Sequence, residues 1–459
     1  MRFPGIPKNR SLTVAALLAC TIALSAETIV IRNVDVYPVN GAELKGVSVV
    51  LQDGKIAEIG AKIIPVKGAR IIEGKGLRVY PGMIDSGTEL GLSEISAVRE
   101  SVDTGELGEF MPQLRALSAV NPESEHFGVV RVNGITSVMT FPSSGGGGGG
   151  GGRFGGGERQ YISGQAALIH TDGWTWEDMA IDRSAAVHLI FPTLGGRGGR
   201  GGGGAPPDAT LEIIPGAAGA TGATGFTAAK RTYDRQVAKI TEFFDAARQY
   251  QKERAAKGPG FRPDLKMEAM MPILEGKVPL AISAARASVI HDAIAFADKQ
   301  KLRIVILQPR DIAKAGPELK AKNIPVILGR VLALPEQEDD PYDGAFTQPA
   351  EAYKAGVKFA FGTFNNEFVR NLPYQAATAV AFGLPYEEAL KAVTINAAQI
   401  WGHGNEIGSV EKGKVADLMV TTGDPLEIST QVKYLFIKGK EIPLVNKQTR
   451  LYEKYMSRQ

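Results

Sequence analysis

The sequence contains very little cysteine and histidine. Its 459 residues include one cysteine, Cys20, and five histidines, none of which has a second histidine two or four positions away. If the N-terminal run that holds Cys20 is removed, the mature chain has no cysteine, which excludes disulfides and thiolate metal sites. Paired histidine ligands usually lie two or four residues apart on one strand or helix, and that spacing is absent.

Strong charge and long apolar runs are absent too. The net charge of +3 is small, whereas a nucleic-acid binder carries many basic residues clustered on one face. No nucleic-acid partner is therefore expected. The apolar run from Leu12 to Leu24 is shorter than the about 20 residues that cross a membrane. Residues 1–26 are predicted to be a signal peptide cleaved near Ala26. We expect an exported protein, periplasmic or extracellular, with no membrane span; lipid anchoring through Cys20 is the less favoured alternative.

Strand patterns occupy both ends of the chain, and a mixed pattern lies between them. Residues 28 to 80 alternate as strands do, with Asp53-Gly54 as a hairpin turn. In the middle, short apolar strands alternate with helical segments, which are clearest at 228–257 and 286–299. This alternation is typical of a parallel α/β barrel. With 44% hydrophobic residues, the chain is long enough for a barrel and a smaller domain.

Three segments resemble one known family. They are VYPGMIDSGTELG at 79–91, AVTINAAQIWG at 392–402 and IGSVEKGKVADLMVTTGDPL at 407–426. Together they resemble the amidohydrolase superfamily, and INAAQIWG narrows the resemblance to its imidazolonepropionase-like branch. The resemblance implies an α/β fold, a (β/α)8 TIM-like barrel with a small β-sandwich domain built from both chain ends. The expected boundaries are 27–80 and 406–459 for the sandwich and C-terminal tail, and 81–405 for the barrel.

Two glycine-rich insertions interrupt the barrel pattern, at 145–157 and 195–204. Glycine has no side chain to bury and the largest backbone entropy to lose, so mobile loops are expected. Each insertion directly follows a predicted strand. Loops that follow barrel strands emerge at the C-terminal face, where active sites lie, so both insertions are predicted to flank the barrel mouth.

The resemblance also implies where metal ligands would be. Superfamily enzymes activate water on zinc or another divalent metal, which four barrel strands hold. The two histidine positions of the first strand correspond to Ser86 and Thr88, and those of the fifth and sixth strands to Ser283 and Gln308. The aspartate that serves as general base in the eighth strand corresponds to Phe364. These vestigial positions carry no good zinc ligand, so no metal or other cofactor is expected.

Four other polar residues are candidates to line a pocket at the barrel mouth. Asp85 is expected to brace the end of its strand, and Arg286 and Arg310 lie near predicted strand ends. His170 lies where the resemblance implies a lysine, at a strand end predicted to face the mouth, and a hydrogen-bonding role is favoured over metal binding. His188 is expected to pack inside its strand.

Three functions remain open from the sequence. The favoured hypothesis is a non-catalytic homologue that acts as a binding or partner subunit, as a homo-oligomer or with an amidohydrolase relative. The second is a hydrolase of non-peptide carbon-nitrogen bonds with an altered or metal-free site. The third is a secreted protein that binds a small ligand at the mouth. The fold alone does not separate them, because function belongs to the site.

Overall fold

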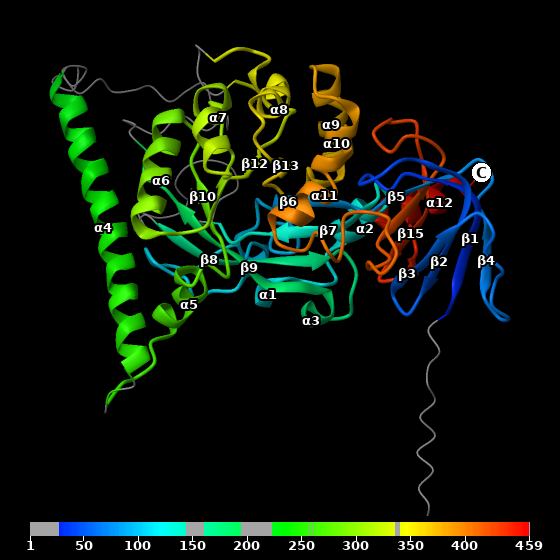
Figure 1. Cartoon of the computed structure of the whole chain (residues 1–459), viewed down its shortest axis with the longest axis horizontal. Helices are drawn as coiled ribbons and strands as arrows, with labels where there is room; N and C mark the ends of the chain where they lie inside the picture. The colour runs from blue at the N-terminus through cyan, green and yellow to red at the C-terminus, as the bar shows by residue number, and fades with distance from the viewer. Residues whose placement is uncertain are drawn as a thin grey trace, which may run out of the picture.

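The structure, a computed structural model, describes residues 27–143, 160–193, 223–256, 258, 260–335 and 340–458. The predicted signal peptide and both glycine-rich insertions lie outside the described residues. Two sheets lie along the long axis of the molecule (Figure 1). A sheet of terminal strands is at one end, the larger barrel sheet is in the middle, and the long helix α4 lies at the opposite end.

The terminal sheet confirms that both chain ends build one small β domain. Its eight strands run in the order β16-β15-β14-β5-β1-β2-β3, and β4 pairs with β1. The strands are β1 (Ile29–Val36), β2 (Leu44–Gln52), β3 (Lys55–Gly60), β4 (Arg70–Glu73), β5 (Arg78–Pro81), β14 (Leu418–Thr421), β15 (Val432–Ile437) and β16 (Lys440–Ile442). One face buries its own apolar core, which includes Ile31, Val49 and Phe436. Asp53 has a φ of 51° at the predicted hairpin turn between β2 and β3.

The barrel sheet has eight strands in sequence order from β6 to β13. They are β6 (Met83–Thr88), β7 (Ile135–Thr140), β8 (Ile162–His170), β9 (Ala180–Ile190), β10 (Leu280–Ser283), β11 (Ile304–Leu307), β12 (Val326–Leu328) and β13 (Phe359–Phe361). The sheet nearly closes where β13 returns to β6, because the Phe364 amide donates to the Gly87 carbonyl at 2.7 Å. The predicted TIM-like α/β barrel is therefore confirmed.

One barrel strand runs against the others, which corrects the expectation of an all-parallel barrel. β8 pairs antiparallel with both β7 and β9, whereas every other neighbouring pair is parallel. The chain therefore enters β8 at the barrel mouth and leaves it at the opposite end. Alternating periodicity reveals which side chains share a face, but it does not reveal strand direction.

Most helices cover the outer face of the barrel strands, whereas α11 packs against the interior cluster and α12 projects from the molecule. They are α1 (Ala116–Ala119), α2 (Glu125–Arg131), α3 (Trp176–Met179), α4 (Ala223–Ala256), α5 (Leu265–Leu274), α6 (Ala287–Gln300), α7 (Ile312–Ala321), α8 (Gly344–Ala355), α9 (Leu372–Ala381), α10 (Tyr386–Ala392), α11 (Ile395–Ile400) and α12 (Lys447–Met456), with 3-10 turns η1 (Arg99–Ser101) and η2 (Val369–Asn371). The two helices predicted at 228–257 and 286–299 correspond to α4 and α6. None of the described helices combines the length and apolar character that a membrane crossing needs.

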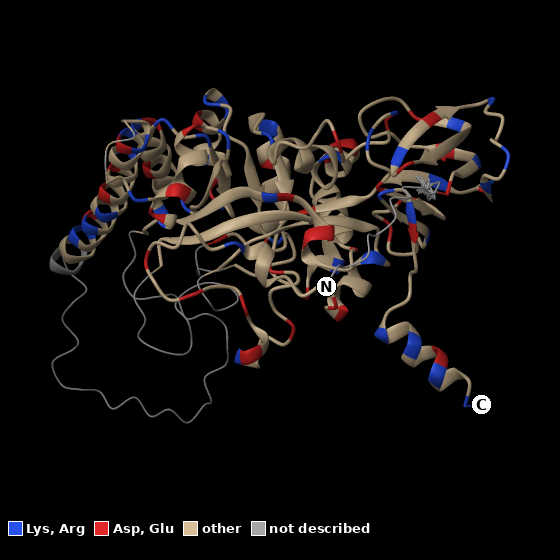
Figure 2. Cartoon of the chain, turned by 90° about the horizontal axis from the view of Figure 1, so that it is seen from below, with Lys and Arg blue, Asp and Glu red and all other residues tan. Residues whose placement is uncertain are grey.

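Alternation along the strands produces two apolar layers. One face of the barrel strands packs against the helices, through residues such as Met83, Leu280 and Ile306. The other face fills the barrel interior, through residues such as Ile84, Ala281 and Leu307. Charged residues lie mostly on the outer helices and on the projecting helix α12, while the central strands carry few of them (Figure 2). The barrel interior is thus mostly apolar, and the polar side chains inside it are exceptions.

Candidate functional site

The five vestigial metal positions gather at one end of the barrel. Ser86 and Thr88 lie on β6, Ser283 is the last residue of β10, and Gln308 directly follows β11. Phe364 comes three residues after β13, and its neighbour Asn365 accepts a hydrogen bond from the Thr88 hydroxyl at 3.0 Å. The resemblance therefore located the C-terminal ends of the right strands.

The two hydroxyls of β6 differ in how their hydrogen bonds are used. Thr88 donates to the Asn365 carbonyl and accepts from the Leu90 amide at 3.2 Å, so it ties β6 to the segment after β13. Ser86 is fully buried, and its hydroxyl has no hydrogen-bond partner among the described residues. Neither side chain offers the charge or the imidazole nitrogen that holds zinc tightly.

Phe364 fills the space between two glycines. A Cβ atom added at Gly87 would lie 2.8 Å from the Phe364 ring, and one added at Gly362 would also lie 2.8 Å from it. Phe364 has a φ of 48°, in the left-handed region that bulky residues avoid, so the surrounding contacts must offset that cost. The ring centroid lies 6.5 Å from that of Phe141, which follows β7. An aromatic plug thus occupies the position where the resemblance implies a general base.

Asp85 braces the closing seam, as expected. Its carboxylate accepts hydrogen bonds from the Gly87 amide at 3.0 Å, the Thr363 amide at 3.1 Å and the Thr363 hydroxyl at 2.6 Å. The side chain is completely buried. Burial raises the pKa of Asp85 to about 7, although these three donors act in the opposite direction. The two hydrogen bonds from Thr363 join β6 to the segment after β13.

Ser283 belongs to a hydrogen-bonded chain that the sequence did not predict. Its hydroxyl lies 2.8 Å from Nε2 of His188, and the other ring nitrogen, Nδ1, lies 2.8 Å from the Ser163 hydroxyl and 3.0 Å from the Pro142 carbonyl. His188 pairs in register with Ala281, so both side chains face the barrel interior. Burial lowers the pKa of His188 to about 4. The expected packing role for His188 is therefore incomplete.

The other proposed pocket residues make structural contacts. Both guanidinium nitrogens of Arg286 bind the Asp340 carboxylate, at 2.9 and 3.0 Å, and Asp311 lies 3.6 Å away. The Arg310 amide donates to the Ala285 carbonyl at 2.8 Å. Gln308 is exposed and has a φ of 53°. The ligand pocket at the barrel mouth stays a prediction.

The expectation that His170 faces the barrel mouth is wrong. Because β8 runs antiparallel, its last residue His170 pairs with Ser137 near the start of β7, at the opposite end of the barrel. There Nδ1 of His170 lies 3.4 Å from the carboxylate of Asp417, which precedes β14 of the terminal sheet. Burial favours the neutral imidazole of His170 and the neutral carboxylic acid of Asp417. It therefore lowers the pKa of His170 to about 3 and raises the pKa of Asp417 to about 7.

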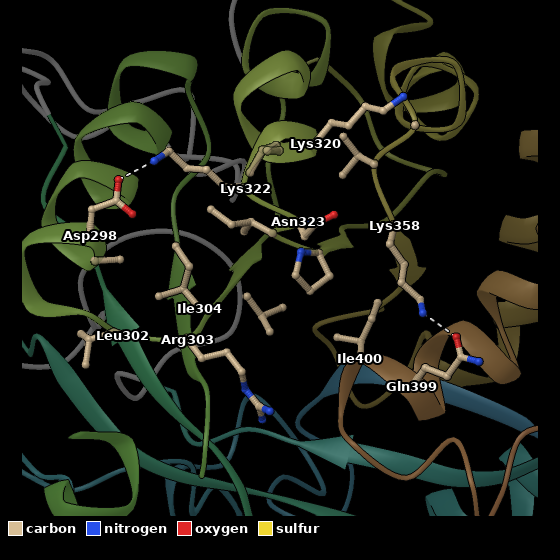
Figure 3. A pocket seen from close by; sticks show the side chains of 17 residues that line it. Asp298, Leu302, Arg303, Ile304, Lys320, Lys322, Asn323, Lys358, Gln399 and Ile400 are labelled. Atoms are coloured by element: carbon tan, nitrogen blue, oxygen red, sulfur yellow. Dashed lines mark hydrogen bonds and ion pairs between the residues drawn. The ribbon is translucent and has the colours of Figure 1, made fainter. Parts of the chain in front are cut away.

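A cavity of about 430 Å³ lies at the end of the barrel away from the mouth (Figure 3). It is bordered by Arg303, Lys320, Lys322 and Lys358 and by one carboxylate, Asp298. Lys322 binds Asp298 at 2.6 Å and caps the C-terminus of α7. Helix C-termini carry partial negative charge, which these cations offset. The charge of Lys320 and Lys322 is therefore explained by the end of α7.

A metal does not fit the residues at the barrel mouth. The vestigial positions supply three neutral hydroxyls and one amide, and the phenyl ring of Phe364 takes the place of a carboxylate. Within the part of the chain that the structure describes, no group of three or more His, Cys, Asp or Glu side chains could hold a metal ion. His188 lies close to the mouth but is the single imidazole in the Ser163-His188-Ser283 chain.

Comparisons with known proteins agree with this architecture. The sequence model of the Amidohydrolase family matches residues 344–442. Amidohydrolase tasK of Hapsidospora irregularis is 24% identical over 393 residues, which is 79% of this chain but 36% of tasK. The imidazolonepropionase of Sphingopyxis alaskensis is 44% identical over 57 residues, which is 12% of this chain and 14% of that protein. The chain thus spans well under half the length of either relative.

A solved structure extends the likeness over the fold. The amidohydrolase from Thermotoga maritima MSB8 superposes with a TM-score of 0.73 at 24% identity, over 90% of this chain and 99% of that one. The family match covers α8 to β16, which includes the two C-terminal segments singled out in the sequence. The family model over residues 344–442 and both relatives support placing the chain in the amidohydrolase superfamily, and the short imidazolonepropionase match supports its imidazolonepropionase-like branch.

Proposed function

We propose that this chain is an exported amidohydrolase-family protein that has lost the metal-dependent reaction and serves as a binding or partner subunit. The ligand positions support this proposal, because Ser86, Thr88, Ser283 and Gln308 supply neutral oxygens and one amide. Such donors suit zinc poorly and give the site no negative charge. Export is supported by the N-terminal sequence pattern.

The observation that carries the proposal is the position of Phe364. In the resemblance, this position holds the aspartate that accepts a proton from attacking water. The Phe364 ring instead packs against Gly87 and Gly362, where it removes the base and fills space at the mouth. Restoring a single ligand would supply neither the geometry nor the charge of a metal site.

Elemental analysis of the full mature chain, purified without chelators, tests the proposal. We expect well under one zinc per chain and no chelator-sensitive hydrolysis of N-acyl amino acids. One zinc or more per chain, together with hydrolysis that a chelator abolishes, would overturn the proposal. The combined variant Ser86→His, Thr88→His, Ser283→His, Gln308→His and Phe364→Asp is the matched positive control, because it restores every implied ligand and the base.

The partner role needs its own measurement. A binding subunit should form a defined oligomer, either with itself or with a catalytically complete relative that is co-expressed and co-exported. Light scattering after size exclusion would show a mass above that of one chain in either case. A monomer that does not associate with the relative would contradict the partner role and leave the loss of metal chemistry unaffected.

A further inference from the structure

Three side chains form one polar chain across neighbouring strands β8, β9 and β10. Ser163 and His188 are buried, whereas Ser283 is only partly buried and ends its strand. The two Oγ atoms each lie 2.8 Å from a different ring nitrogen of His188. Of the three hydrogen-bonded side chains, the partly exposed one is therefore Ser283. Its hydroxyl lies at the C-terminal edge of the barrel, where active sites lie in this fold.

The contacts around Nδ1 determine which nitrogen holds the proton. Pro142 offers only a carbonyl acceptor, 3.0 Å from Nδ1, so this nitrogen donates. The Ser163 hydroxyl donates to the same carbonyl at 3.0 Å, which leaves its lone pairs to accept from Nδ1. In the neutral ring Nε2 is then unprotonated and accepts the Ser283 proton. This is the arrangement of a nucleophile, a base and a group that orients the base.

We infer that Ser283 is a nucleophile activated by His188, which gives the barrel a metal-independent acyl-transfer site for small esters or amides. Phe141 and Phe364 lie beside this site and favour a small, apolar acyl group. The Phe141 ring packs edge-on against His188, with ring centroids 5.6 Å apart. Gln308 follows the neighbouring strand β11 and is exposed, so its amide offers hydrogen-bond donors at the same edge.

The covalent step balances with the groups present. The Ser283 oxygen bonds to the carbonyl carbon while its proton moves to Nε2 of His188, and the carbonyl electron pair moves onto oxygen. When that pair returns, the bond to the amine or alkoxide breaks, and the leaving group takes the proton from Nε2. Water then attacks the acyl-serine with the same base, which releases the acid and restores both residues.

A purely structural explanation is that the two serines only provide hydrogen-bond partners for the buried imidazole of His188. That explanation accounts for Ser163, which is completely buried and bonds to Pro142. It does not require a partly exposed serine on the other nitrogen. Burial also lowers the pKa of His188 to about 4, which keeps the ring neutral and able to accept a proton near neutral pH.

This inference goes beyond the proposed subunit role and does not depend on it. Ser283 stands where the resemblance implies a metal-binding histidine, so the inference shares with the proposed function the loss of that ligand. A partner role, however, does not require Ser283 to be reactive. Zinc with chelator-sensitive hydrolysis would overturn the proposed function. The absence of a Ser283 adduct would overturn the present inference alone.

A fluorophosphonate probe tests the site directly, on the full mature chain in the presence of chelator. Serine displaces fluoride and forms a phosphorus-oxygen bond, so intact mass and peptide mapping report the adduct. We expect one adduct per chain, on Ser283, and none with Ser283→Ala. The matched control Ser137→Ala, which removes another buried barrel serine, should label like the wild type. His188→Gln should slow labelling on the order of 100-fold, the usual contribution of a general base.

Three outcomes would overturn the inference: no adduct on the folded wild type, an adduct mapped to another residue, or equal labelling of Ser283→Ala. Circular dichroism of each variant separates lost reactivity from lost structure. If His188→Gln does not fold, the wild type and Ser283→Ala still decide the question. A second probe, p-nitrophenyl acetate, should release p-nitrophenol with wild type and Ser137→Ala but not with Ser283→Ala.

Discussion

The hydroxyl of Thr363 donates to the Asp85 carboxylate at 2.6 Å, across the seam where the last barrel strand meets the first. The two residues are 278 positions apart in sequence. Few backbone hydrogen bonds close the barrel here, so one buried carboxylate links β6 to the segment after β13. Asp85 thus has a structural function that survives without a metal.

Replacing Asp85 with asparagine should change how stability depends on pH. The pKa of Asp85 is raised to about 7 in the folded chain, above the about 3.9 of an unfolded aspartate. The folded state therefore binds more protons, and this contribution is lost as pH rises from about 4 to 7. Urea unfolding gives the free energy of unfolding of the wild type and of Asp85→Asn at each pH. The difference between them should favour the wild type more at pH 5 than at pH 8. An identical pH dependence would contradict the prediction.

The asparagine variant keeps the seam contacts, which makes it a suitable comparison. Its side-chain oxygen can accept from the two backbone amides, and its nitrogen can donate to the Thr363 hydroxyl. That hydroxyl also lies 3.1 Å from the Asn365 carbonyl, to which its own hydrogen can turn. Asp85→Ala loses all three hydrogen bonds and should lower the free energy of unfolding by about 2 kcal/mol or more.

Gly87→Ala should destabilise the barrel because its new methyl group meets the Phe364 ring at 2.8 Å. Overpacking of this kind costs about 1–3 kcal/mol. In the background of Phe364→Ala the same substitution should cost much less, so the two changes should not be additive. Denaturant unfolding of the four proteins in the cycle measures the coupling. Additive effects would show that the ring does not fill this space.

Labelling of Ser283 should depend on the protonation of His188. Because burial lowers the pKa of this imidazole to about 4, the rate should be nearly level from pH 5 to 8 and fall below about pH 4. The groups that face the ring are Ser163 on β8, Ser283 on β10, and the Pro142 carbonyl and Phe141 ring after β7. No charged side chain contributes to the shift. A midpoint near pH 6.5 would contradict this burial-based prediction.

The contact between His170 and Asp417 should fasten the barrel to the terminal sheet. Asp417 also accepts the Lys438 amide at 2.8 Å. Asp417→Ala should lower the free energy of unfolding by about 1 kcal/mol, because it leaves that partly buried donor without its acceptor. Asp417→Asn keeps an acceptor and should cost less. Equal thermal stability of both variants and the wild type would show that the contact is neutral.

Much of the fold could be predicted from the sequence, because apolar runs mark strands and the family segments set their order. The direction of β8 could not, since AALIH has the same alternation in either orientation. His170 was placed at the wrong end of the barrel for that reason. The sequence predicts only a packing role for His188 because its partner Ser283 is 95 positions away, and a single sequence does not show which residues lie opposite each other.

The reversed strand β8 also has a consequence for how the chain folds. Strands β7, β8 and β9 form an antiparallel meander, and Ile169 of β8 pairs with Ala180 of β9 across a connection that contains the short helix α3. Parallel pairs such as β9 with β10 join Val187 to Leu280 and must close a far longer loop first. Local pairings form faster because they lose less chain entropy. The meander is therefore better suited to nucleate the barrel than the β9–β10 pair is, and its amides should gain protection from hydrogen exchange before those that join β9 to β10 during refolding.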